Sequence, residues 1–263
     1  SCRGNGITRR LLMRLLTTGF NSAYWNMSVD EAILEMVASN AVEPTLRFYG
    51  WQPHAISIGY FQGIEEEVDR EACKRMDIDI VRRITGGGAV FHADELTYSI
   101  VIPETHYLAC HDILKSYESI LQGVINGFNE LGLQAEFAPI NDIIINNKKV
   151  SGNAQTRKYG CILQHGTILI SVEPETMFTL LKVPNEKLKG KLIADIKERV
   201  TSIRALLGTS VSFESVQKSF IQGFARLLKE PLIEGSLTHE ELERARILQE
   251  TKFGTEAWNN KRL

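Results

Sequence analysis

Cysteine is scarce in this chain, and its scarcity excludes two classes of small protein. Four of the 263 residues are cysteine, at positions 2, 73, 110 and 161, and no two of them form a CxxC pair. A disulfide framework or a zinc ribbon needs closely spaced cysteines, so neither is indicated. A chain of this length buries a core large enough to fold without such cross-links.

An excess of charge of one sign is also lacking, as are long hydrophobic runs. The chain has 30 Lys and Arg against 32 Asp and Glu, a net charge of −2. This balance gives no basic surface for nucleic acid, and no apolar run approaches the roughly 20 residues of a membrane span. We therefore expect no nucleic-acid partner, no membrane contact and a cytoplasmic location. An acid-free start with four arginines, at 3, 9, 10 and 14, leaves organellar targeting open.

Hydrophobic periodicity divides the chain into a strand-rich part and a helical part. Strands are expected at 13–17, 45–49, 55–60, 78–82, 96–102, 142–145, 149–152 and 161–172, and helices at 27–37, 65–76, 111–131, 174–182, 184–198, 212–228 and 238–250. Asn26 is the expected N-cap of the first helix, and 45–49 is expected to pair with 55–60. The fold class is therefore α+β.

Three consecutive glycines at 86–88 follow Arg82 and Arg83 between two expected strands. Glycine backbone N–H groups can form a concave anion site, and arginine adds charge and a bidentate fork. A flexible hairpin loop with two solvated arginines explains the same pattern. Neither the Walker motif nor the dinucleotide fingerprint is present.

A short hairpin brings Asp142 and Lys149 close together, because Asn146-Asn147 forms a tight turn between their strands. A carboxylate can hold Mg²⁺, and a lysine suits phosphate or a developing negative charge. Solvated turn residues are the alternative. His165 interrupts an apolar strand, where a histidine is more often a hydrogen-bonded core residue than a ligand contact.

Four motifs, taken in their order along the chain, resemble those of the lipoate–protein ligase family. They are Arg83 with 85–92 (TGGGAVFH), 141–142 (ND), 149–152 (KVSG) and 165–167 (HGT). The resemblance implies a biotin/lipoate ligase-like fold of the class II synthetase type, a mixed sheet flanked by helices with a helical C-terminal tail. It also implies that lipoate is activated with ATP to lipoyl-AMP, and that the lipoyl group then passes to a lysine of a lipoyl domain.

The resemblance also implies partners and site residues. ATP and Mg²⁺ are the implied cofactors, and the E2 subunits of 2-oxoacid dehydrogenases and the glycine-cleavage H protein are the implied acceptors. Lys149 is the implied catalytic residue. The implied ATP-binding residues are Arg83, Gly88, Ala89, Val90, Phe91, Asp142 and Lys149, the implied lipoate-binding residues are Gly87, His92, Lys149, Gly152, Ala154 and His165, and Asp142 would hold Mg²⁺.

Two alternatives share this resemblance. Octanoyltransferases of the same fold work without ATP through a cysteine in the loop before the strand of Asp142, and 133–142 contains no cysteine. On this ground we expect the ATP-dependent ligase. An incomplete ligase subunit, active only with a small separate accessory protein, is the other alternative. We expect one catalytic domain over 1–263, poorly ordered at 1–12 and mainly helical over 173–263, without an accessory domain.

Overall fold

A computed structural model describes residues 12–183 and 185–262 of the chain. The expected disorder at 1–12 therefore lies outside the described residues, apart from residue 12. Eight strands form the main sheet in the order β11-β1-β2-β6-β10-β9-β8-β7. Their bounds are β1 (Met13–Asn21), β2 (Thr45–Trp51), β6 (Glu95–Pro103), β7 (Glu136–Ala138), β8 (Asp142–Ile145), β9 (Lys148–Lys158), β10 (Cys161–Leu169) and β11 (Leu232–Glu234).

The main sheet is mixed. Strand β1 is parallel to β2 and to β11, whereas the pairs β2–β6, β6–β10, β10–β9, β9–β8 and β8–β7 are antiparallel. A second sheet has the order β4-β3-β5, with β3 (Ala55–Ile58), β4 (Asp79–Arg82) and β5 (Val90–His92). The expected mixed sheet flanked by helices is confirmed.

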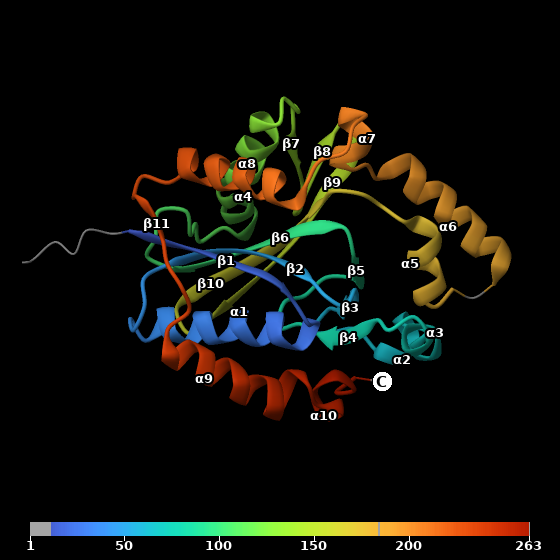
Figure 1. The fold of residues 1–263 in the computed structure, drawn as a ribbon, viewed down its shortest axis with the longest axis horizontal. Coiled ribbons are helices and arrows are strands. Elements are labelled where there is room, and N and C mark those ends of the chain that lie inside the picture. The colour runs from blue at the N-terminus through green and yellow to red at the C-terminus, as the bar shows by residue number, and fades with distance from the viewer. Residues whose placement is uncertain (1–11, 184, 263) are drawn as a thin grey trace, which may run out of the picture.

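Helices cover both faces of the main sheet (Figure 1). One face carries α4 (Ile113–Glu130) and α8 (Phe213–Leu227), and the other carries α1 (Ala23–Ala38), with α9 (His239–Leu248) packed on α1. The remaining helical elements are α2 (Ile64–Glu67), α3 (Arg70–Arg75), α5 (Pro174–Leu180), α6 (Glu186–Arg199), α7 (Ile203–Leu207), the π-helical turn η1 (Gln249–Phe253) and α10 (Glu256–Asn259). None of the helices in the described part of the chain is both long and apolar enough to cross a membrane.

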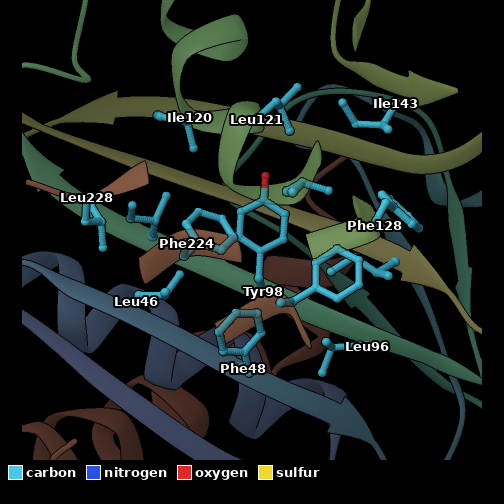
Figure 2. Close-up of a cluster of buried hydrophobic side chains, with 14 of the residues drawn as sticks. Leu46, Phe48, Leu96, Tyr98, Ile120, Leu121, Phe128, Ile143, Phe224 and Leu228 are labelled. Atoms are coloured by element: carbon cyan, nitrogen blue, oxygen red, sulfur yellow. The ribbon is translucent and has the colours of Figure 1, made fainter. Parts of the chain in front are cut away.

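Alternation along the strands sends apolar residues to the α4/α8 face. Figure 2 shows Tyr98 of β6 with Phe48 of β2 and Phe224 of α8 around it. The ring centroids of Tyr98 and Phe224 lie 5.4 Å apart, and both residues are fully buried. The opposite side of β6 carries Thr97 and Ser99, so this face of the sheet is polar at these positions.

Three sequence predictions of local structure are wrong. The first helix begins at Ala23, with Ser22 as its N-cap, because the Ser22 hydroxyl accepts from Trp25 N at 3.2 Å. Asn26 is instead buried inside the helix. The stretches 45–49 and 55–60 do not pair with each other but belong to different sheets. The helix expected at 65–76 is two helices, because Asp69 caps a new one at Ala72 N.

Candidate functional site

A pocket of about 670 Å³ opens between the polar face of the main sheet, the glycine loop before β5 and the α5–α6 segment. Such a volume is within the range of small-molecule sites. Every site residue predicted from the sequence lines it. These are Arg83, Gly87, Gly88, Ala89, Val90, Phe91, His92, Asp142, Lys149, Gly152, Ala154 and His165. The structure thus brings together residues up to 82 positions apart, whereas their individual roles stay predictions.

Arg83 organises the glycine loop from inside. Its Nη2 donates to Gly86 O and Gly88 O, both at 2.8 Å, and its Nη1 donates to Ser57 Oγ at 3.0 Å. The side chain is 5% exposed, and burial lowers the pKa of Arg83 to about 10, so the guanidinium stays charged at neutral pH. This geometry contradicts the alternative of a flexible loop with solvated arginines.

The loop conformation needs glycine at one position in the loop and at one position in the segment that the loop touches. Gly87 has φ +98°, where other residues are strained. A Cβ on Gly59 would lie 2.0 Å from Gly87 O, so the two segments touch through their backbones. Tyr60 N also donates to Thr85 O at 2.9 Å, which fixes the loop against the end of β3.

Arg82 does not contribute to the pocket, although the sequence paired it with Arg83. Successive side chains of a strand point to opposite sides, and Arg82 points to the C-terminal segment. Its Nη1 donates to Gln62 O at 2.6 Å and its Nη2 to Asn259 O at 2.9 Å. Arg82 is therefore a buried structural residue.

Lys149 and Asp142 form an ion pair at the rim of the pocket. Lys149 Nζ lies 2.8 Å from Asp142 Oδ1, and the two side chains are 41% and 32% exposed. The predicted turn between their strands is confirmed, since Asn146 and Asn147 both have the positive φ that such a turn requires. A Cβ on Gly152 would lie 2.9 Å from Lys149 Cε, so glycine leaves room for this lysine.

The donor set does not make a Mg²⁺ site by itself. The Oδ1 atom of Asp142 already faces Lys149, and the described residues contain no group of three or more His, Cys, Asp or Glu that could hold a metal ion. Mg²⁺ can be held by one carboxylate together with substrate phosphates, so Mg²⁺ binding at Asp142 stays a prediction. No chemical step below depends on it.

His165 links the sheet, α1 and the glycine loop. Its Nε2 lies 2.6 Å from Thr85 Oγ1 and its Nδ1 lies 3.3 Å from Asp30 Oδ2, while Asp30 Oδ1 accepts from Arg47 and Ser99, both at 2.8 Å. Burial lowers the pKa of His165. Burial opposes the charge of Asp30, but the bond from His165 and the charge of Arg47 outweigh it and lower the pKa of Asp30. His165 is both buried and pocket-lining, so the two interpretations of its sequence context are compatible.

A second buried histidine has partners that sequence reasoning missed. His92 Nδ1 lies 2.8 Å from Glu95 Oε1, and His92 Nε2 lies 2.7 Å from Ser57 Oγ. Trp51 stacks on the imidazole with ring centroids 3.9 Å apart, and its Nε1 donates to Thr97 Oγ1, which donates to Glu95 Oε1. The spacing of His92 and Glu95 was visible in the sequence, but Ser57 lies on another strand.

The apolar wall of the pocket was also missed. It consists of Leu169, Val172, Met177, Phe178, Leu181, Ile196 and Val200, from the end of β10 to the end of α6. Apolar residues at helical spacing are common in any core, so their spacing alone could not place them at a pocket. Together with Phe91 they make one side of the pocket suited to a hydrocarbon chain.

No cysteine lines the pocket among residues 12–183 and 185–262. Cys73 and Cys161 are buried elsewhere, and burial raises the pKa of both thiols, to about 11 for Cys73. Cys110 is half-buried, with its Sγ 3.7 Å from Ser119 Oγ. Cys161 is therefore a packing residue.

The fold and the pocket agree with those of a known family of catalytic domains. The model of the lipoyl protein ligase A/B catalytic domain matches residues 22–225, so the chain belongs to that family. Among curated relatives, octanoyltransferase LipM of Geobacillus kaustophilus is 37% identical over 95% of this chain and 98% of its own length. Octanoyltransferase LipM of Kyrpidia tusciae is 39% identical over 94% and 97%.

A solved structure supports the same fold. The bipartite lipoate protein ligase of Thermoplasma acidophilum, solved with its E2 lipoyl domain, has a TM-score of 0.86 and is 32% identical, covering 96% of this chain and 98% of that one. The family resemblance and fold expected from the sequence are therefore confirmed.

The expectation of an ATP-dependent lipoate–protein ligase is wrong. Curated relatives that are 34%, 37% and 39% identical to this chain along nearly its whole length are octanoyltransferases. The sequence prediction failed because it relied on the missing cysteine at 133–142 and gave less weight to similarity along the rest of the chain. The findings favour the transferase alternative.

Proposed function

We propose that this chain transfers an octanoyl group from a thioester of a carrier protein to the ε-amine of a lysine on a lipoyl domain. The octanoyltransferase relatives carry the proposal, since they match the chain along nearly its whole length. The pocket supports it with an apolar wall for a hydrocarbon chain and a polar rim. Lipoyl domains of 2-oxoacid dehydrogenase E2 subunits and the glycine-cleavage H protein are the proposed acceptors.

The proposed reaction supplies its own driving force. A thioester is already activated, so an amine can displace the thiol without a nucleotide. Two cations are available to the negative charge that develops on the acyl oxygen, Arg83 beneath the glycine loop and Lys149 at the rim. Fixed charges in a partly dry site stabilise such an oxyanion more strongly than water does. Asp142 would hold Lys149 in place and offer a carboxylate to the incoming ammonium group.

The deciding experiment incubates the purified chain with octanoyl-carrier protein and a lipoyl domain and follows the acceptor mass. We expect octanoylation at the same rate with and without ATP and Mg²⁺. A lipoyl domain with arginine at the acceptor position is the control and should stay unmodified. Modification that occurs only with free acid and ATP would overturn the proposal. Using the chain alone also tests whether a separate accessory protein is required.

A further inference from the structure

The pocket contains a serine in the geometry of an activated nucleophile. Ser57 of β3 lines the pocket, and its Oγ lies 2.7 Å from His92 Nε2. The other imidazole nitrogen, Nδ1, lies 2.8 Å from Glu95 Oε1. A nucleophile, a base within hydrogen-bond reach and a third group that orients the base are the three parts by which covalent catalysis is recognised.

The surroundings of the imidazole fix its role. A carboxylate next to Nδ1 holds the tautomer with a proton on that nitrogen, so Nε2 accepts from the Ser57 hydroxyl. Thr97 also donates to Glu95 Oε1, and Trp51 stacks on the ring, so neither carboxylate nor ring is free to turn. Glu95 Oε2 is buried without a hydrogen-bond partner in the described residues, which leaves the carboxylate able to stabilise an imidazolium.

Arg83 prepares the same oxygen for negative charge. Its Nη1 donates to Ser57 Oγ at 3.0 Å, while its Nη2 holds Gly88 O in the glycine loop at 2.8 Å. One guanidinium thus connects Ser57 to the loop, where a Cβ on Gly88 would meet no atom within 4 Å. An acyl carbonyl bound along that loop would therefore lie beside a fixed positive charge.

The hydrogen bonds of His165 can be compared with those of His92. Its Nε2 lies 2.6 Å from the Thr85 hydroxyl and its Nδ1 faces Asp30, which is the same pattern of three groups. Thr85 and Ser57 are both buried, but Thr85 does not line the pocket. Of the two hydroxyl residues, Ser57 is the one that lines the pocket.

We propose that Ser57 is the nucleophile of the transfer, with His92 as general base and Glu95 as the residue that positions His92. This inference rests on the proposed octanoyl transfer. Ser57 Oγ attacks the thioester carbonyl carbon and gives its proton to His92 Nε2. The carbon–sulfur bond breaks, the thiolate takes that proton, and an octanoyl ester of Ser57 remains.

In the second half of the reaction the acceptor amine is the nucleophile and Ser57 is the leaving group. The neutral ε-amine of the acceptor lysine attacks the ester carbonyl and gives a proton to His92 Nε2. The carbon–oxygen bond to Ser57 breaks, the proton returns to Ser57 Oγ, and an amide is formed. Ser57 is only 1% exposed, so the ester is shielded from water until the acceptor arrives.

The first test looks for the ester. The full chain is mixed with octanoyl-carrier protein without acceptor, and intact mass and peptide mapping are recorded. We expect one octanoyl group on Ser57, its transfer when lipoyl domain is added, and no adduct in Ser57→Ala. Octanoylation of the acceptor without an adduct, or with the adduct on another residue, would overturn the role of Ser57 and leave the proposed function intact. A wild-type chain that transfers nothing would refute the proposed function itself.

The second test separates chemistry from packing. Ser57→Ala should lower the transfer rate on the order of 10³-fold. Ser57→Cys keeps a nucleophile and should restore transfer while making it sensitive to iodoacetamide. The matched control is Ser28→Ala, since Ser28 is buried in α1 and its hydroxyl donates only to Tyr24 O at 2.7 Å. Equal loss in Ser57→Ala and Ser57→Cys with an unchanged circular dichroism spectrum would show a purely structural serine.

Discussion

Lys149 Nζ lies 2.8 Å from Asp142 Oδ1 across the β8–β9 hairpin. Both side chains are about one-third exposed or more, so the pair contributes little to stability, and its position on the pocket rim suggests a role in function. Gly152, the register partner of Asp142, carries no Cβ where the lysine chain lies. The hairpin thus presents one cation to the pocket with a fixed direction.

Removing this cation should impair transfer and leave the fold intact. We expect Lys149→Ala to lower kcat/KM about 10²-fold, because among the described residues that line the pocket the other Lys or Arg is Arg83, which lies beneath the glycine loop and not at the rim. Lys148→Ala is the control, since Lys148 is the next residue but does not line the pocket. Rates are measured by mass spectrometry of the lipoyl domain. A decrease of less than about three-fold in Lys149→Ala would mark it as a solvated turn residue.

The sequence predicted the parts of the site that are local. The glycine loop and the hairpin are contiguous segments, so their turn chemistry and their strand alternation follow from neighbouring residues. Strand alternation also separates Arg82 from Arg83, and applying it would have assigned only one arginine to the pocket.

Partners distant along the chain could not be predicted. Asp30 and His165 are 135 positions apart, and Ser57 and His92 are 35 apart. Their contacts depend on how two sheets and α1 are placed in space, which no local pattern encodes. For the same reason 45–49 and 55–60, which look like a hairpin, lie in different sheets: each finds other partners.

The buried His165 should make stability depend on pH. Burial lowers the pKa of His165 below its ordinary value of about 6.5, so the unfolded chain binds the proton more readily. The stability contributed by neutral His165 is fully present above about pH 6.5 and is lost as pH falls through the folded pKa. One proton changes the free energy of unfolding by at most about 1.4 kcal/mol per pH unit.

Urea unfolding between pH 7.5 and pH 5.5 measures this effect. We expect His165→Gln to have a shallower pH dependence than the wild type. His239→Gln is the control, because the side chain of His239 is 82% exposed. A slope equal to that of the wild type in His165→Gln would assign the pH dependence to other groups. Asp30 titrates far below this range, since its pKa is lowered from an already acidic value.

Arg82 should be needed for the attachment of the C-terminal segment. Its guanidinium donates to carbonyls on both sides, Gln62 O and Asn259 O, which lysine cannot reach together. We expect Arg82→Lys to lower the free energy of unfolding by about 2 kcal/mol, because buried carbonyls lose their donors. Arg75→Lys is the control at an exposed position of α3. Equal urea midpoints for the two variants would contradict this role.

Gly223 sets how closely α8 approaches α4. A Cβ on Gly223 would lie 2.2 Å from Gly127 N and 2.6 Å from Gly123 O, which are backbone atoms that cannot turn aside. Gly223→Ala must therefore push the helices apart, and we expect it to destabilise the fold by about 2 kcal/mol in urea unfolding. Gly190→Ala makes the same change in α6 with no atom within 4 Å, and helix propensity should make it stabilising by up to about 1 kcal/mol. Opposite signs for the two variants isolate the close approach, whereas stabilisation by both would show that helix propensity alone decides.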